Sequence, residues 1–139
     1  MIMEDSPSID FLMLADYAEI VGGKLYTMGG AWDRITVNDP AQPLRFAVVL
    51  AVLVPWNATN QNHSMQIAIA DTDGTQQGIL LESSFVTGRP PDLRPGSTQR
   101  VLIAANVLIP AGAPGEYALV ATIDGEERRR IAFMVLQGA

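Results

Sequence analysis

Two segments of the chain carry apolar residues at nearly every position, Phe46–Val54 and Val101–Ile109. A strand with one face in solvent alternates apolar and polar residues, so an almost unbroken apolar run predicts a strand that is covered on both faces. Each run has about half the ~20 residues that a bilayer-spanning helix needs, and Pro55 directly follows the first run. The pattern therefore predicts two buried strands, covered by a second layer of the fold or by another subunit.

Clusters of glycine and proline divide the rest of the chain into short segments that are rich in β-branched, aliphatic and aromatic residues. This spacing is typical of a β-sandwich or a β-barrel. We expect strands near residues 10–20, 24–30, 32–37, 45–54, 64–71, 79–86, 99–108, 116–123 and 127–136. The first segment also fits a helix, because Phe11, Leu14, Ala15 and Ala18 would form a helical stripe. The pattern predicts one all-β domain over residues 1–139, an antiparallel β-sandwich of about 8–9 strands, with a jelly roll as the alternative.

The last two segments predict a hairpin whose register depends on its turn. Tyr117 and Leu119 belong to one face of the incoming strand, and Ile131 and Phe133 belong to one face of the outgoing strand. A plain two-residue turn at Asp124–Gly125 would place Leu119 opposite Arg130, so the two apolar faces would not coincide. We therefore expect a three-residue loop or a β-bulge in this hairpin.

The segments that flank these elements resemble a known group of proteins. The run from Ala15 to Ile35, with Gly23-Lys24-Leu25 and Gly29-Gly30-Ala31-Trp32, followed by Pro40 and Pro43, is similar to the opening of a family of small uncharacterised bacterial proteins, a domain of unknown function. The closing Pro114-Gly115-Glu116-Tyr117, Asp124-Gly125-Glu126 and Phe133-Met134-Val135 resemble the final hairpin of immunoglobulin-like bacterial sandwiches. The resemblance implies an immunoglobulin-like fold and a bacterial cytoplasm, and it transfers no catalytic residue.

The charge and composition of the chain restrict its partners. The formal net charge is −6, and no cysteine is present among the 139 residues. An acidic chain argues against nucleic acid and against anionic membranes, because both need clustered lysine and arginine. Glu4 and Asp5 stand where a secretory signal would carry basic residues. We expect a cytoplasmic protein without a signal peptide, a cofactor or a thiolate metal site.

Two polar patterns suggest chemistry but have simpler explanations. Asp71 to Glu82 has the outline of a calcium-binding EF-hand loop, yet Gln76 stands at the position that requires glycine. A hairpin turn at Asp73–Gly74 explains the segment, so no metal site is expected. The only histidine, His63, lies in a polar stretch that we interpret as a solvated loop, and a hydrolase that combines His63 with carboxylates remains an alternative.

The sequence also suggests two interaction surfaces. One is a proline-stiffened loop with Arg89, Leu93 and Arg94, together with Trp56 at a strand end, which would form a binding surface at low ordering cost. The other is the second apolar face of the strand near 45–54, which comprises Ala47, Val49, Ala51 and Leu53. We expect it to be an oligomer interface, and the competing explanation is that a helix or loop from the first twenty residues covers it in a monomer.

These observations favour a protein that is not an enzyme. We expect it to act by protein–protein assembly or binding, most simply as a homo-oligomer. A carbohydrate or small-ligand binding module that uses Trp56 and the neighbouring loops is the alternative within the binding class.

Overall fold

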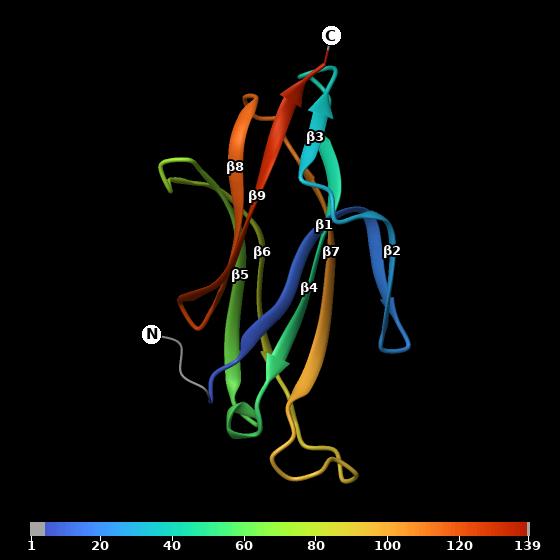
Figure 1. The fold of residues 1–139 in the computed structure, drawn as a ribbon, viewed down its shortest axis with the longest axis vertical. Helices are drawn as coiled ribbons and strands as arrows, with labels where there is room; N and C mark the ends of the chain where they lie inside the picture. The colour runs from blue at the N-terminus through green and yellow to red at the C-terminus, as the bar shows by residue number, and fades with distance from the viewer. Residues whose placement is uncertain (1–4, 139) are drawn as a thin grey trace.

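The computed structural model describes residues 5–138 and consists of two β-sheets packed face to face (Figure 1). A single turn of 3-10 helix, η1 (Trp56–Ala58), follows β4. The nine strands are β1 (Ser8–Val21), β2 (Lys24–Gly30), β3 (Arg34–Val37), β4 (Leu44–Val54), β5 (Asn62–Asp71), β6 (Gln76–Val86), β7 (Gln99–Ile109), β8 (Gly115–Ile123) and β9 (Glu126–Gln137). Each expected strand is present within a few residues of its predicted range, and the first segment is a strand.

The sheets have the orders β2-β1-β4-β7 and β3-β9-β8-β5-β6. Every pairing is antiparallel except the one between β3 and β9, which is parallel. The expectation of an all-β fold with two packed sheets is therefore confirmed. Of the two apolar segments, one is the central strand β4 and the other is the edge strand β7. The prediction of cover on both faces is correct for β4 and wrong for β7, whose residues are half-buried or exposed.

The main core lies between the two sheets. On β4, alternate residues from Phe46 to Val54 point inward and are fully or almost fully buried. They pack against inward residues of β5 and β8, such as Ile67 and Leu119. Burial of each such side chain contributes about 1.5–3 kcal/mol, so this alternating row supplies much of the stability that a cysteine-free chain requires.

The outer face of β4 is also covered, and the cover comes from the same chain. β1 pairs with β4 only as far as Ala15 and continues beyond it paired with β2 alone. The β1–β2 hairpin lies against the outer face, and Ala18 joins Ala47 and Val49 in a second cluster in which all three side chains are fully buried. The small alanine side chains allow the hairpin to approach the sheet closely.

This cover corrects the predicted oligomer interface. Ala47, Val49 and Ala51 are fully buried within one chain, and Leu53 is half-buried. A subunit interface needs an accessible surface, so these residues do not provide one. The prediction of a homo-oligomer depended on this face and loses its basis.

The β8–β9 hairpin contains a two-residue turn and a β-bulge. Asp124 and Gly125 both have positive φ angles, 52° and 81°, as expected of a type I′ turn. The pairing then shifts, because Thr122 faces Glu127 whereas Ala121 faces Arg129, and Arg128 is the extra residue. The predicted bulge is confirmed, and it sets Leu119 opposite Ile131.

Candidate functional site

The predicted binding residues lie at one end of the sandwich, the lower end in Figure 1. There η1 follows β4, and the connection 87–98 joins β6 to β7. We refer to these two segments, η1 and residues 87–98, as the loop end. Two hydrogen bonds outside the strands fasten it, from the Asn60 N–H to the Thr87 carbonyl (2.8 Å) and from Gln99 Nε2 to the Gly88 carbonyl (2.7 Å).

Trp56 and Arg89, which sequence reasoning placed on one surface, are in direct contact. The guanidinium carbon of Arg89 lies 3.9 Å from the centroid of the Trp56 ring. Arg89 also donates through Nε to Thr59 Oγ1 (2.6 Å) and through Nη2 to the Trp56 carbonyl (2.8 Å). A stacked and doubly hydrogen-bonded guanidinium has little conformational freedom left to lose on binding. Arg89 thus holds the loop against η1 and keeps its positive charge at a fixed place.

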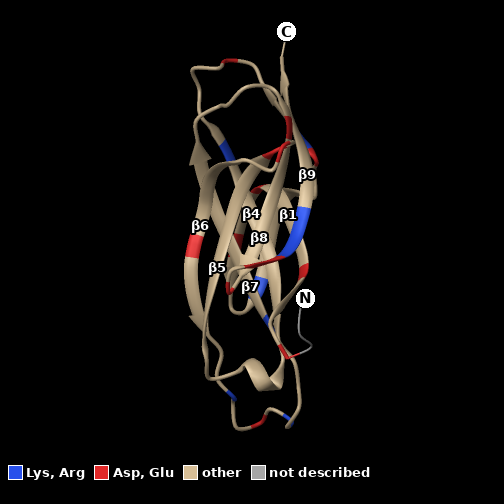
Figure 2. Ribbon diagram, turned by 90° about the vertical axis from the view of Figure 1, so that its left-hand side faces the viewer, with Lys and Arg blue, Asp and Glu red and all other residues tan. Residues whose placement is uncertain are grey.

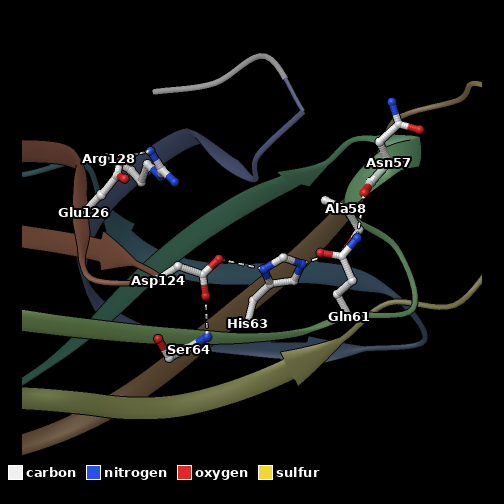
Figure 3. A network of polar contacts seen from close by, with 8 residues as sticks. All are labelled: Asn57, Ala58, Gln61, His63, Ser64, Asp124, Glu126 and Arg128. Atoms are coloured by element: carbon white, nitrogen blue, oxygen red, sulfur yellow. Dashed lines mark hydrogen bonds and ion pairs between the residues drawn. The ribbon is translucent and has the colours of Figure 1, made fainter. Parts of the chain in front are cut away.

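His63, at the start of β5, connects the loop end to the rest of the sandwich (Figure 3). Its Nε2 lies 2.7 Å from the Ala58 carbonyl of η1, and its Nδ1 lies 2.7 Å from Asp124 Oδ2. The second oxygen of Asp124 accepts a hydrogen bond from the Ser64 N–H at 3.0 Å. The histidine therefore links the β8–β9 turn to the segment that carries Trp56.

Hydrogen-bond acceptors face both nitrogens of the His63 ring. One is the Ala58 carbonyl and the other is the Asp124 carboxylate. Burial acts to raise the pKa of Asp124, but the hydrogen bonds from His63 and the Ser64 N–H outweigh it. Together with the charges of His63 and Arg128, they hold the pKa of Asp124 below its ordinary value.

The interpretation of His63 as a solvated loop residue is wrong. The residue is 5% exposed and its ring stacks near Phe85. The polar sequence around it misled the prediction, because the residues that bury His63 come from η1, β6 and the β8–β9 turn. The alternative of a hydrolase that uses His63 as a general base also loses support, because the Nε2 atom of His63 is already hydrogen-bonded to the Ala58 carbonyl.

Leu93 and Arg94 lie farther out in the connection 87–98, with Leu93 half-buried and Arg94 exposed. Two turns shape this part of the loop, closed by hydrogen bonds from Leu93 N–H to the Pro90 carbonyl and from Ser97 N–H to the Arg94 carbonyl. The loop carries one acidic residue, Asp92, beside its two arginines. Figure 2 shows blue segments at this end of the molecule.

The segment with the outline of an EF-hand loop is, as expected, a turn, and its own Asp71 stabilises it. Asp71 Oδ1 accepts hydrogen bonds from the N–H groups of Asp73 and Thr75, both at 2.9 Å, and Oδ2 accepts one from Gln77. Donors therefore already surround both oxygens. Within residues 5–138, no three histidine, aspartate or glutamate side chains gather as a metal site, and no helix is long and apolar enough to cross a bilayer.

Comparison with known proteins identifies a family and a fold neighbour. The model of a family described as a family of unknown function (DUF6941) matches residues 10–136. No curated protein matches the chain in sequence. Among solved structures, the chain is similar to the Pseudomonas fluorescens alkylpurine DNA glycosylase AlkC bound to DNA containing an abasic site analog. The TM-score is 0.52 at 14% identity, and the match covers 94% of this chain and 30% of that chain.

This similarity corrects the predicted list of partners. The acidic composition suggested that nucleic acid could be excluded, but the same fold occurs within a chain that has been solved on DNA. Net charge is a sum over the whole surface, whereas binding depends on the charge of one face. The exclusion of nucleic acid therefore does not hold, and the expected protein or self-association partner has no support in the comparisons.

Proposed function

Because the chain belongs to DUF6941, a family of unknown function, we propose its function from its geometry: a non-enzymatic binding module that contacts the phosphate backbone of DNA through its loop end. The fold supports an immunoglobulin-like arrangement, since the run β9-β8-β5-β6 corresponds to the G-F-C-C′ order of variable domains. Such sandwiches commonly bind through the loops at one end.

The observation that carries the proposal is the fixed guanidinium of Arg89. It is held by the Trp56 ring, by Thr59 and by the Trp56 carbonyl, and Arg94 lies in the same loop. Among residues 5–138, neither side chain forms an ion pair. Two arginines at one end offer charge-assisted hydrogen bonds to phosphate oxygens.

The distribution of charge restricts how a polyanion can approach. The turns at the opposite end carry Asp39, Asp71 and Asp73, with Arg45 near them at the start of β4, so that end is less favourable to a phosphate backbone than the loop end. A contact of about two phosphates gives weak binding whose affinity falls with salt, with a log–log slope near −2. The module would act as an accessory contact and not as the main source of affinity.

The fold neighbour and the local geometry favour DNA over a carbohydrate. The structure of that neighbour was solved with DNA bound, and we take DNA as the proposed ligand from this similarity. Sugars bind by stacking on a free aromatic face, and Arg89 already covers one face of Trp56. A sugar could therefore stack on only one face of the Trp56 ring, which makes the carbohydrate alternative less favourable.

Nuclear magnetic resonance can test the proposal at the affinities expected. A short DNA duplex titrated at low salt should shift the amide resonances of residues 56–60 and 87–98, with the shifts reversed as salt is added. Arg94→Ala should weaken the response at least threefold. Arg34→Ala removes an exposed arginine of β3 that pairs with Asp33, and it should leave the titration unchanged. Equal effects of the two variants, or shifts elsewhere only, would reject the proposal.

A further inference from the structure

A concave site lies at the end of the sandwich opposite the loop end. It is a pocket of about 460 Å³ between the two sheets, where β4 begins and β7 ends. Its walls are apolar, and they include Leu44, Ile69, Leu80, Ile109 and Phe133. No charged side chain lines it. Small-molecule sites in proteins are mostly apolar concavities of ~300–1,000 Å³ with a few polar groups at fixed positions.

Two β-bulges in the edge strand β6 form the wall of this pocket. The pairing of β6 with β5 passes from Leu81 to Ile79 while β5 advances by one residue, so Leu80 is an extra residue. A second shift between Gly78 and Gln76 makes Gln77 an extra residue as well. Both extra residues line the pocket. Bulges redirect side chains and are enriched beside functional sites, so the pocket is built by a specific irregularity of the strand.

Gly78 lies between the two bulges and leaves room in the pocket. It pairs with Ile69, whose side chain belongs to the core between the sheets, so a side chain at position 78 would point inward as well. A Cβ atom added at Gly78 would meet no atom within 4 Å. The glycine therefore keeps open a space that a larger residue would fill.

Gln77 provides a polar group at the edge of this apolar space. Its Nε2 donates to Asp71 Oδ2 at 3.0 Å, which fixes the amide, whereas among residues 5–138 no hydrogen bond reaches its Oε1. The other polar side chain of the pocket is satisfied, because the Tyr117 hydroxyl donates to the Ala113 carbonyl. The pocket thus offers one free acceptor, no charge and a large apolar surface.

We infer that this inter-sheet pocket binds a small uncharged apolar molecule that carries one hydrogen-bond donor, such as a medium-chain alcohol. The apolar part of the ligand is removed from water against Leu80, Ile109 and Phe133, and its donor meets Gln77 Oε1. A carboxylate on the same carbon chain would enter without a cationic partner and beside Asp71, so it is disfavoured. The inference is independent of DNA contact at the loop end.

Fluorescence of N-phenyl-1-naphthylamine, a neutral apolar probe with one N–H donor, tests the inference. The wild-type chain should bind one probe molecule saturably, and 1-decanol should displace it at a concentration at least tenfold lower than decanoate. Gly78→Leu should weaken probe binding at least tenfold while the melting temperature stays the same or rises. Its matched control is Gly88→Leu at the loop end, where the nearest atom to an added Cβ is 3.9 Å away, and this change should leave probe binding intact.

Three outcomes overturn the inference: no saturable binding, equal displacement by decanoate and decanol, or equal loss of binding in both glycine variants. If Gly78→Leu fails to fold, the comparison of decanol with decanoate on the wild-type chain still decides. DNA titration of Gly78→Leu separates this site from the proposed function. If Gly78→Leu loses probe binding but keeps its response to DNA, both the pocket and the DNA contact are supported. If neither the wild-type chain nor the variant responds to DNA, only the proposed loop-end contact is rejected.

Discussion

The side chain of Asn106 holds the backbone of Ala18 at the point where β1 crosses the outer face of its own sheet. Asn106 Nδ2 donates to the Ala18 carbonyl at 2.7 Å, and Asn106 Oδ1 accepts from the Ala18 N–H at 3.3 Å. One amide thus satisfies both backbone groups of a fully buried residue that pairs with β2 on one side only. This contact fixes the β1–β2 hairpin over β4, so that the apolar outer face of β4 is covered.

Substitution of a residue beneath this hairpin should unfold the protein instead of separating subunits. Val49 is fully buried, so Val49→Glu leaves a carboxylate without water or a partner, and we expect a loss of about 3–5 kcal/mol in the free energy of unfolding. Urea denaturation followed by circular dichroism measures it. Val86→Glu is the matched control, because Val86 is 62% exposed, and it should change stability by no more than about 0.5 kcal/mol. Similar losses in the two variants would contradict the burial of Val49.

A double-mutant cycle can measure the coupling between His63 and Asp124. His63→Ala removes the donor to two acceptors, and Asp124→Asn keeps a residue that tolerates the positive φ of the turn. We expect each single variant to lose stability and the pair to couple by about 1–3 kcal/mol. Strictly additive losses in urea denaturation would show that the two residues act independently.

The same pair predicts how stability responds to acid. Since the pKa of Asp124 is lowered in the folded state, the unfolded chain takes up its proton first as pH falls from about 5. The contribution of Asp124 is therefore fully present above the unfolded pKa of ~3.9 and is lost as pH falls through the folded value. Wild type and Asp124→Asn, denatured with urea at several pH values from 5.5 to 2, should differ most at the upper end and converge at the lower end. A difference that is constant with pH would contradict the ionised pair.

Deletion of Arg128 tests the register of the β8–β9 hairpin. Without Arg128, Thr122 still faces Glu127 and Leu119 still faces Ile131, so the pairing becomes regular and the apolar faces of the two strands still coincide. We therefore expect the deletion variant to fold, as judged by a dispersed amide spectrum. Arg128→Ala retains the residue count and should fold, although it loses the hydrogen bond from Arg128 Nη1 to Glu126. A deletion variant that does not fold would show that the bulge itself is required, and not only the register that it sets.

The strands were predictable because alternating and continuous apolar patterns follow from local geometry. The bulge was predictable for the same reason, since Leu119 and Ile131 had to share a face. The cover over β4 from the first twenty residues was considered only as the alternative to an oligomer interface, because the small residues Ala15 and Ala18 gave no sign of a close approach. A signal in its favour was Asn106, the polar residue within the apolar run Val101–Ile109.

The candidate sites were predictable only in part. Trp56 and Arg89 were assigned to one surface, and the structure places them in contact. The burial of His63 was not predictable, because Asp124 lies 61 positions away in the sequence and no local pattern indicates their pairing. The inter-sheet pocket was also missed, since the bulges at Gln77 and Leu80 arise from the pairing of two strands and leave no mark in the pattern of either one.

The parallel pairing of β3 with β9 has a consequence for synthesis on the ribosome. Arg34 pairs with Met134, so β3 finds its partner in the second sheet only when β9 has been translated, about one hundred residues later. At roughly 5–20 residues per second the intervening chain takes seconds to appear, and during this time the inward residues of β4 lack the strands that bury them. The nascent chain must therefore be protected from aggregation until β9 has been synthesised, and the second sheet should be completed only then.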